Sequence, residues 1–171
     1  MKAFLRKLPR LARQFFMYVA VFFVVSFGVD YVRAPKLPES FSSRPVWQDI
    51  HGQPVDVIAM SEKSPVLVYF WGSWCGVCRV TSPSVDRLHD DGVAVLGVAM
   101  ASGDEQAVKH YLKQHDWQFN SVSDETGELS SAWGVGVAPS LLIIKDGKIR
   151  HATTGFSSYW GLKARLLLSS I

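Results

Sequence analysis

The chain contains only two cysteines, Cys75 and Cys78, and they are two residues apart. Such a close pair can form a redox-active disulfide, half of a metal site, or a small structural disulfide. The pair follows an uninterrupted apolar run at residues 66–71, which predicts a strand buried on both faces. Other features of the sequence are needed to distinguish these three interpretations.

Thiol–disulfide exchange is the chemistry that this spacing favours. It needs one thiolate that attacks a disulfide and a second thiol that resolves the mixed disulfide. A helix that begins near Cys75 would favour its thiolate, because free N–H groups and the helix dipole lower the pKa below the usual value of about 8.5. Cys78 would lie one turn deeper and be more buried. We therefore expect Cys75 to be the nucleophile and Cys78 the resolving thiol.

The metal and structural alternatives are weaker. Zinc normally takes four protein ligands, and the sequence has no second cysteine pair. The sequence has five histidines, His51, His89, His110, His115 and His151. Their spacing does not indicate a ligand set, so we predict no resident metal and no other cofactor. A structural disulfide would close a very small loop and stabilise the fold little. Copper(I) held by the two thiolates remains the alternative.

The net charge of +3 is unevenly distributed along the chain. Six lysines and arginines against Asp30 give residues 1–34 a net charge of +5. Twelve basic residues against fourteen acidic ones leave the remainder at −2. The main domain therefore has no basic stripe of the kind that nucleic acid binding requires.

The N-terminal charge accompanies a long apolar segment. Basic residues in 1–14 precede residues 15–33, which we interpret as a transmembrane signal anchor with its N-terminus in the cytoplasm. A cleaved signal peptide is the alternative. Either interpretation exports the domain to a compartment where disulfides persist. Two prolines in residues 34–40 indicate an extended linker, and residues 41–171 form the domain.

The domain alternates strand and helix patterns. We predict strands at residues 66–71, 93–100, 141–144 and 149–152. We predict helices at about residues 75–89, 102–115 and 158–168. A small hairpin is expected from residues 46–50 and 55–57, and Asp146-Gly147 should form a second hairpin turn. Pro83 should kink the first helix. This order predicts an α/β fold with a mixed central sheet flanked by helices.

Two segments resemble the thioredoxin superfamily. Residues 70–79, with Pro83 further on, are similar to its active-site segment, and residues 136–140 are similar to its cis-proline loop. The hairpin and residues 93–124 resemble the membrane-tethered bacterial branch that includes TlpA, ResA and the cytochrome c maturation thioredoxins. Within that branch the similarity is greatest to the suppressor-of-copper-sensitivity D group. The resemblance covers about residues 41–168.

The resemblance implies a thioredoxin-like fold and a protein disulfide oxidoreductase with a redox-active disulfide between Cys75 and Cys78. It implies that Pro139 is cis and packs against the cysteine pair. The backbone of Ala138 would then pair with an extended substrate segment. Trp74 would form part of an exposed apolar rim around Cys75.

The same resemblance implies partners and a location. The substrates would be thiols and disulfides of exported proteins, and a transmembrane thiol reductase would supply electrons. The protein would be a single-pass protein of the bacterial inner membrane, held through residues 15–33, with its catalytic domain in the periplasm.

Three positions depart from the family pattern. Tyr69 stands where cytoplasmic thioredoxins carry a buried aspartate, and Thr81 stands where the tethered branch often has glutamate. Tyrosine, with a pKa of about 10, is a poor base near neutral pH. Our hypothesis is that Cys78 loses its proton with little side-chain assistance. The dipeptide Gly76-Val77 adds no charge beside the thiols, so we expect a mild to reducing potential.

Overall fold

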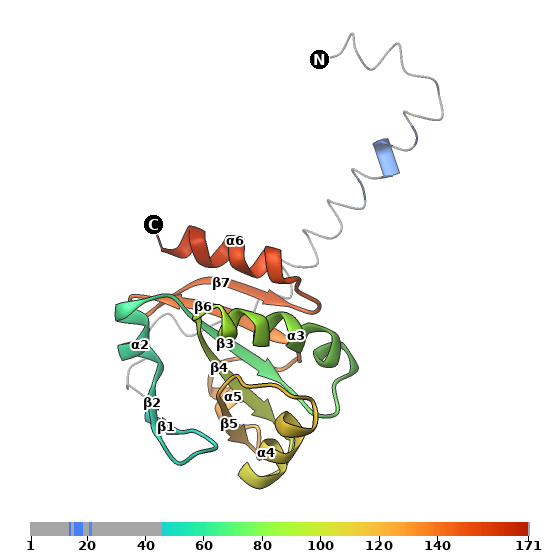
Figure 1. Ribbon diagram of the computed structural model, residues 1–171. Helices are drawn as coiled ribbons and strands as arrows, with labels where there is room; N and C mark the ends of the chain where they lie inside the picture. The colour runs from blue at the N-terminus through green and yellow to red at the C-terminus, as the bar shows by residue number, and fades with distance from the viewer. Residues whose placement is uncertain (1–13, 15, 19–20, 22–45, 171) are drawn as a thin grey trace. The chain divides into compact units, whose positions relative to one another are not determined.

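The computed structural model describes residues 14, 16–18, 21 and 46–170. Residues 46–170 form a five-stranded mixed sheet flanked by helices, with a separate two-stranded hairpin (Figure 1). This confirms the predicted α/β fold. The basic N-terminus at residues 1–14, the anchor at 15–33 and the linker at 34–40 lie almost entirely outside the described residues. Among those that are described, no helix is long and apolar enough to span a bilayer.

The central sheet places the strand before the cysteines at its centre. Its strands, in spatial order, are β5 (Ser121–Asp124), β4 (Ala94–Met100), β3 (Val66–Trp71), β6 (Ser140–Lys145) and β7 (Lys148–Thr154). Strands β3, β4 and β5 are parallel, whereas β6 is antiparallel to both β3 and β7. Every side chain of β3 is fully buried, as its uninterrupted apolar sequence predicts.

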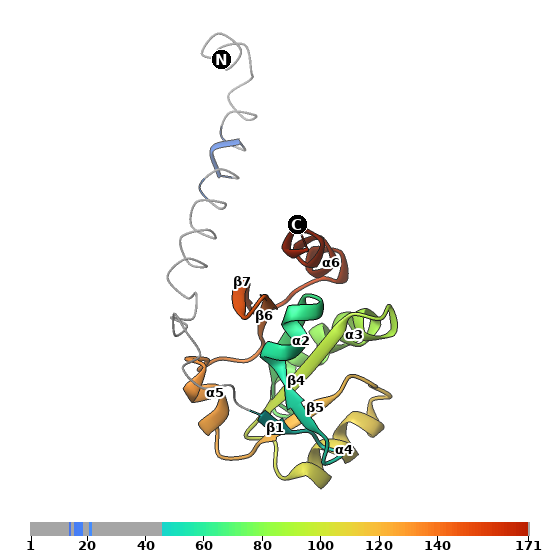
Figure 2. The ribbon, with the colours of Figure 1, turned by 90° about the vertical axis from the view of Figure 1, so that its left-hand side faces the viewer.

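The alternation of β3 side chains divides the core into two layers. Leu67, Tyr69 and Trp71 pack with residues of α3 (Gly76–Asp90), α4 (Glu105–Gln114) and α6 (Tyr159–Ser169). Val66, Val68 and Phe70 face the other layer. That layer is formed by β1 (Val46–Gln48), β2 (Pro54–Asp56), α2 (Val57–Lys63) and α5 (Glu128–Ala132). Figure 2 shows α3 and α5 on opposite sides of the sheet.

Three elements were missing from the prediction: α2, β5 and α5. In α2 the carboxylate of Asp56 accepts the N–H of Ala59 at 2.9 Å, which begins a helix where we expected the strand to continue through Val57. Strand β5 has no apolar periodicity and is defined by its pairing with β4. Helix α5 is only five residues long. Short elements with weak patterns depend on tertiary contacts.

Several predicted boundaries were also wrong. Helix α4 begins at Glu105 rather than at residue 102, because Asp104 accepts the N–H of Ala107 at 2.8 Å. Strand β1 ends at Gln48 rather than at residue 50. There the carboxylate of Asp49 accepts backbone N–H groups and turns the chain. The helix after the cysteines, in contrast, agrees with the predicted residues 75–89: it runs from Gly76 to Asp90 and contains Pro83.

Candidate active site

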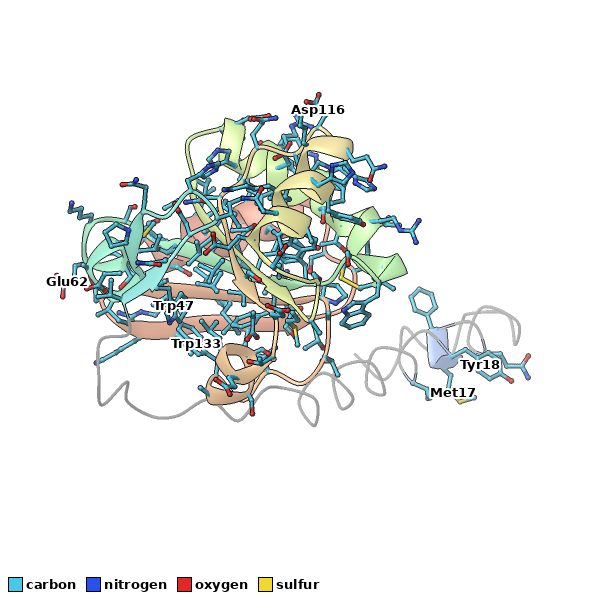
Figure 3. The ribbon with its side chains drawn as sticks, turned by 90° about the horizontal axis from the view of Figure 1, so that it is seen from below. Met17, Tyr18, Trp47, Glu62, Asp116 and Trp133 are labelled. Carbon is cyan, nitrogen blue, oxygen red and sulfur yellow. A yellow bond between two sulfur atoms is a disulfide. The ribbon has the colours of Figure 1, made fainter. Side chains whose placement is uncertain are left out.

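The two cysteines form a disulfide at the N-terminus of α3, which Figure 3 shows in yellow. Cys75 is the N-cap residue, with extended backbone angles of φ −90° and ψ 108°. The N–H of Cys78 points at the Sγ of Cys75 at 3.1 Å. The first cysteine therefore occupies the position where a helix terminus stabilises negative charge.

The two sulfur-bearing residues differ in burial. Cys75 is 6 % exposed, whereas Cys78 is 1 % exposed and belongs to the core layer with Tyr69 and Val85. A substrate disulfide can therefore approach Cys75 more readily than Cys78. The sequence analysis expects this difference in exposure, with the attacking thiol more accessible than the resolving thiol.

The loop before β6 lies against the cysteine pair. The Ala138–Pro139 peptide bond is cis, and the carbonyl oxygen of Ala138 is 3.5 Å from the Sγ of Cys75. Pro139 is buried and Ala138 is half-buried. The carbonyl of Pro139 accepts the N–H of Gly155 at 2.8 Å, which connects this loop to the end of β7. The structure thus brings together the sequence-predicted residues of the cysteine motif and the proline loop.

Trp74 lies on the surface beside Cys75 and is held in place by the end of β4. Its Nε1–H donates to the carbonyl of Met100 at 3.0 Å, yet 58 % of the residue is exposed. Its ring lies so close to Gly72 that a Cβ at that glycine would come within 2.5 Å of it. The hydroxyl of Ser102 accepts the N–H of Ser73 at 2.9 Å. These contacts fix an exposed aromatic ring next to the disulfide.

Other exposed apolar residues belong to the same segments. Val77 is 47 % exposed and Val137 is 54 % exposed. Phe156 is 62 % exposed and directly follows Gly155, the residue that donates to Pro139. Sequence reasoning missed Phe156, because an isolated phenylalanine in a polar loop carries no pattern. The pairing of β7 with β6 and the hydrogen bond from Gly155 to Pro139 bring it to the proline loop.

Hydroxyl groups surround the backbone of Cys78 on the sheet side. The Tyr69 hydroxyl lies 3.0 Å from the Ser82 hydroxyl and donates to the carbonyl of Cys78 at 3.3 Å. Burial raises the pKa of Tyr69 above its ordinary value, so the phenol stays protonated at neutral pH. Thr81 is fully buried, and its hydroxyl donates to the carbonyl of Val77 at 3.1 Å. These groups are poorly suited to accept a proton from a thiol.

Across the part of the chain that the structure describes, no group of three or more histidine, cysteine, aspartate or glutamate side chains is arranged to hold a metal ion. The arrangement that is present is suited to thiol–disulfide exchange. A Cys-x-x-Cys disulfide at a helix N-terminus, placed after the central strand and against a cis-proline loop, defines a thioredoxin-like protein disulfide oxidoreductase.

Comparison with known proteins agrees with this class. The chain belongs to the AhpC/TSA family, whose model matches residues 36–152. It is 37 % identical to a thioredoxin-like protein of Haemophilus influenzae over 95 % of this chain and 97 % of that one. It is 33 % identical to the thiol-disulfide oxidoreductase ResA of Bacillus thuringiensis subsp. konkukian, over 63 % of this chain and 64 % of ResA.

Solved structures show the same fold. A putative thiol:disulfide interchange protein DsbE from Chlorobium tepidum superposes with a TM-score of 0.67 at 23 % identity. The match covers 80 % of this chain and all of the other. The chain is thus a thiol–disulfide oxidoreductase of the DsbE and ResA type with a Cys75–Cys78 pair.

Proposed function

We propose that this protein is a membrane-anchored periplasmic enzyme that reduces disulfides of exported proteins, with Cys75 as nucleophile and Cys78 as resolving thiol. The observation that carries the proposal is the position of the Cys75 sulfur. It accepts an N–H at the start of α3 and lies against the Ala138 carbonyl. A thiolate there is stabilised by the helix and faces the backbone edge that a substrate would use.

The first step starts from the reduced enzyme. The Cys75 thiolate attacks one sulfur of a substrate disulfide, and a mixed disulfide forms as the substrate S–S bond breaks. The other substrate sulfur leaves as a thiolate and takes a proton from water. The substrate backbone pairs with Ala138 by strand addition, and Trp74, Val77 and Phe156 contact its apolar side chains.

The second step releases the product. Cys78 loses its proton and attacks the Cys75 sulfur of the mixed disulfide. The substrate sulfur leaves as the second thiolate, and the Cys75–Cys78 disulfide forms. Two electrons have then passed from the enzyme dithiol to the substrate. The structure represents this oxidised form.

Regeneration needs two electrons and two protons for each cycle. A transmembrane thiol reductase supplied from the cytoplasm is the partner that this requirement implies, because the periplasm is oxidising. The apolar residues 15–33 and the basic residues before them support an inner-membrane anchor with the domain on the periplasmic side.

Trapping of the mixed disulfide tests the proposal. Cys78→Ala should accumulate covalent complexes with exported proteins, because the resolving step is removed. Mass spectrometry would show each complex joined through Cys75. Cys75→Ala is the matched control and should trap none. Equal trapping by the two variants, or complexes joined through Cys78, would contradict the assignment of roles.

The direction of electron flow has its own measurement. Gly76 and Val77 add no charge beside the thiolate, so the potential should lie nearer to the reducing value of about −270 mV than to the strongly oxidising value of about −120 mV. Equilibration with glutathione buffers measures it. A value near −120 mV would overturn the reducing role and leave the thiol chemistry intact.

Copper(I) binding is the competing function that the sequence leaves open. Two thiolates alone can hold Cu(I) in the reduced enzyme. Titration of the reduced protein with Cu(I), in parallel with a dithiol turnover assay, separates the two functions. Rapid turnover without tight copper binding supports the reductase, and tight binding without turnover supports copper handling.

A further inference from the structure

Helix α6 is apolar on two opposite sides. Its inner side packs into the core through Tyr159, Leu162 and Leu166. Its outer side carries Trp160, Leu167 and Leu168, which are 72 %, 64 % and 65 % exposed. Large apolar side chains gathered on one exposed helix face indicate a surface that contacts something else.

The outer residues form a continuous stripe with a basic residue on each side. At about 100° per residue, Trp160, Ala164, Leu167 and Leu168 fall within about 100° of the helix circumference. Lys163, which is ion-paired with Asp91 at 2.7 Å, borders the stripe on one side, and Arg165 borders it on the other. The helix contains no aspartate or glutamate.

We infer that this outer α6 face, Trp160, Ala164, Leu167 and Leu168, rests on the surface of an anionic lipid bilayer. Tryptophan and leucine favour the boundary between headgroups and acyl chains. Lysine and arginine at the edges of such a stripe extend their charged ends to lipid phosphates. The alternation of apolar stripe and basic border matches a helix that lies in the plane of the interface.

Positive charge also surrounds the C-terminal end of the stripe. Leu168 shares a surface hollow of about 270 Å³ with Lys145 and Arg150 from the β6–β7 hairpin. Asp146 in the same hollow is paired with Lys145 at 2.6 Å and with Arg150 at 3.5 Å, so these three side chains keep one net positive charge. A negative surface is therefore the better electrostatic complement. A second copy of this chain, docked through the same face, would instead bring two copies of the same basic-bordered stripe together.

The inference rests on the membrane anchor of the proposed function, because the anchor keeps lipid within reach. Residues 34–45 can extend about 40 Å. A domain of the size of residues 46–170 has a radius of gyration of about 14 Å. The tether therefore lets any face of the domain meet the bilayer at high effective concentration, and the stripe selects which face does so. Contact through α6 would hold Cys75 in a limited range of orientations to the membrane.

Tryptophan quenching by brominated lipid tests the contact with the full chain. The six tryptophans all lie between residues 47 and 160, outside the anchor, so their fluorescence reports on the domain. The full chain would be placed in nanodiscs of phosphatidylglycerol and phosphatidylethanolamine with bromines on the upper acyl chain. We expect quenching in the wild type, and we expect most of it to disappear in Trp160→Phe.

Two substitutions make the test specific. Leu167→Glu places a charge in the stripe and should reduce the quenching at least about twofold. Val46→Glu changes a residue of the hairpin that is 61 % exposed and should quench like the wild type. Replacing the anionic lipid with phosphatidylcholine should also weaken the quenching, because the basic borders lose their partners.

The outcomes separate this inference from the proposed function. Reduction of a small soluble disulfide by Leu167→Glu should match the wild type, since the stripe takes no part in the chemistry. Retention of the chain in the membrane after carbonate extraction reports the anchor independently. An anchored, active chain with unquenched Trp160 would overturn the inference alone. Loss of quenching in Trp74→Phe instead of Trp160→Phe would also overturn it, because the active-site face would then lie on the lipid.

Discussion

At the scale of single residues, the two cysteines differ in what stabilises them. The Sγ of Cys75 receives the Cys78 N–H at a helix N-terminus, so its thiolate has a physical partner. Around Cys78 the side chains bear hydroxyl groups, and those of Tyr69 and Thr81 already donate to backbone carbonyls. Deprotonation of Cys78 should therefore limit the second step.

A glutamate at position 81 tests this expectation. Thr81 is fully buried on the first turns of α3, three residues after Cys78. Thr81→Glu should accelerate resolution of a mixed disulfide roughly tenfold or more near neutral pH, because a carboxylate can accept the thiol proton. Single-turnover kinetics measure the rate. Thr81→Gln is the matched control without a base, and an unchanged rate and pH profile in Thr81→Glu would count against the hypothesis.

Tyr69→Phe tests whether the buried phenol takes part in proton transfer. We expect that it does not. Its pKa is raised by burial, so it cannot serve as a base, and the pH profile of turnover between about pH 6 and 9 should match the wild type. Loss of the hydrogen bonds to Ser82 and Cys78 should lower the free energy of unfolding by about 1 kcal/mol.

The raised pKa of Tyr69 also predicts the alkaline behaviour. A group whose pKa is higher in the folded state stabilises the fold below its unfolded pKa of about 10, and this contribution disappears as the pH rises above that value. Denaturant unfolding at about pH 9 to 11 should therefore show a smaller alkaline loss for Tyr69→Phe than for the wild type. A lower turnover rate with a shifted pH optimum in Tyr69→Phe would instead assign the phenol a part in proton transfer.

At the scale of elements, the close packing of β4 against β3 and β5 supports the strand that precedes the cysteines. Gly97 of β4 pairs with Tyr69 of β3, the strand that ends at Trp71. A Cβ at Gly97 would come within 2.3 Å of the Ser121 hydroxyl and 2.8 Å of the Trp71 Nε1 atom. The absence of a side chain at this position allows the Trp71 ring to fill the layer beneath the active-site loop.

Gly97→Ala should therefore lower the free energy of unfolding by about 1–3 kcal/mol, the usual cost of overpacking a core. Denaturant unfolding of the oxidised protein measures it. Gly76→Ala is the matched control for stability, because a Cβ at Gly76 meets nothing within 4 Å and alanine favours a helix. Equal free energies of unfolding for Gly97→Ala and the wild type would contradict this prediction. They would show that the side chains around Gly97 can move to accommodate the added methyl group.

At the scale of the whole domain, one buried carboxylate fastens the N-terminal hairpin to the sheet. Asp49 is 3 % exposed and accepts the N–H groups of His51 and Gln53, each at 2.8 Å. Its second oxygen accepts from the side chain of Asn120 at 2.6 Å, just before β5. The N–H of Ile50 donates to the carbonyl of Ser121 beside it.

The pKa of Asp49 makes this connection dependent on pH. Burial is the largest influence and raises the pKa, but the hydrogen bonds from Asn120, Gln53 and His51 together lower it below the ordinary value. A carboxyl with a lowered folded pKa stabilises the fold above its unfolded pKa of about 3.9, and the contribution disappears as the pH falls through the folded value.

Asp49→Asn should lower the free energy of unfolding by about 1–3 kcal/mol at neutral pH, because the charged hydrogen-bond acceptor is lost. The difference from the wild type should shrink below about pH 4. Urea unfolding at a series of pH values measures both effects. Asp56→Asn is the matched control. Asparagine can cap α2 as aspartate does, so this variant should lower the free energy of unfolding much less. A difference for Asp49→Asn that stays constant down to about pH 2 would contradict the assignment.

Much of this protein follows from local sequence patterns. The uninterrupted apolar run of β3 and the Asp146-Gly147 turn each specify a strand or hairpin from neighbouring residues alone. The spacing of Cys75 and Cys78 at the start of a helix predicts the chemistry, because two intervening residues bring both sulfurs together. Residues 15–33 remain a predicted anchor.

Other features depend on segments that are distant in the sequence. Strand β5 and helix α5 lack a pattern of their own, and neither was predicted. The contact of Ala138 with Cys75 joins residues separated by 63 positions. The position of Phe156 depends on the β6–β7 pairing and on the hydrogen bond from Gly155 to Pro139. The sequence by itself determined the reactive pair and the strand and helix that carry it. Only the tertiary structure decided which surfaces surround the pair, because long-range hydrogen bonds and packing bring those loops together.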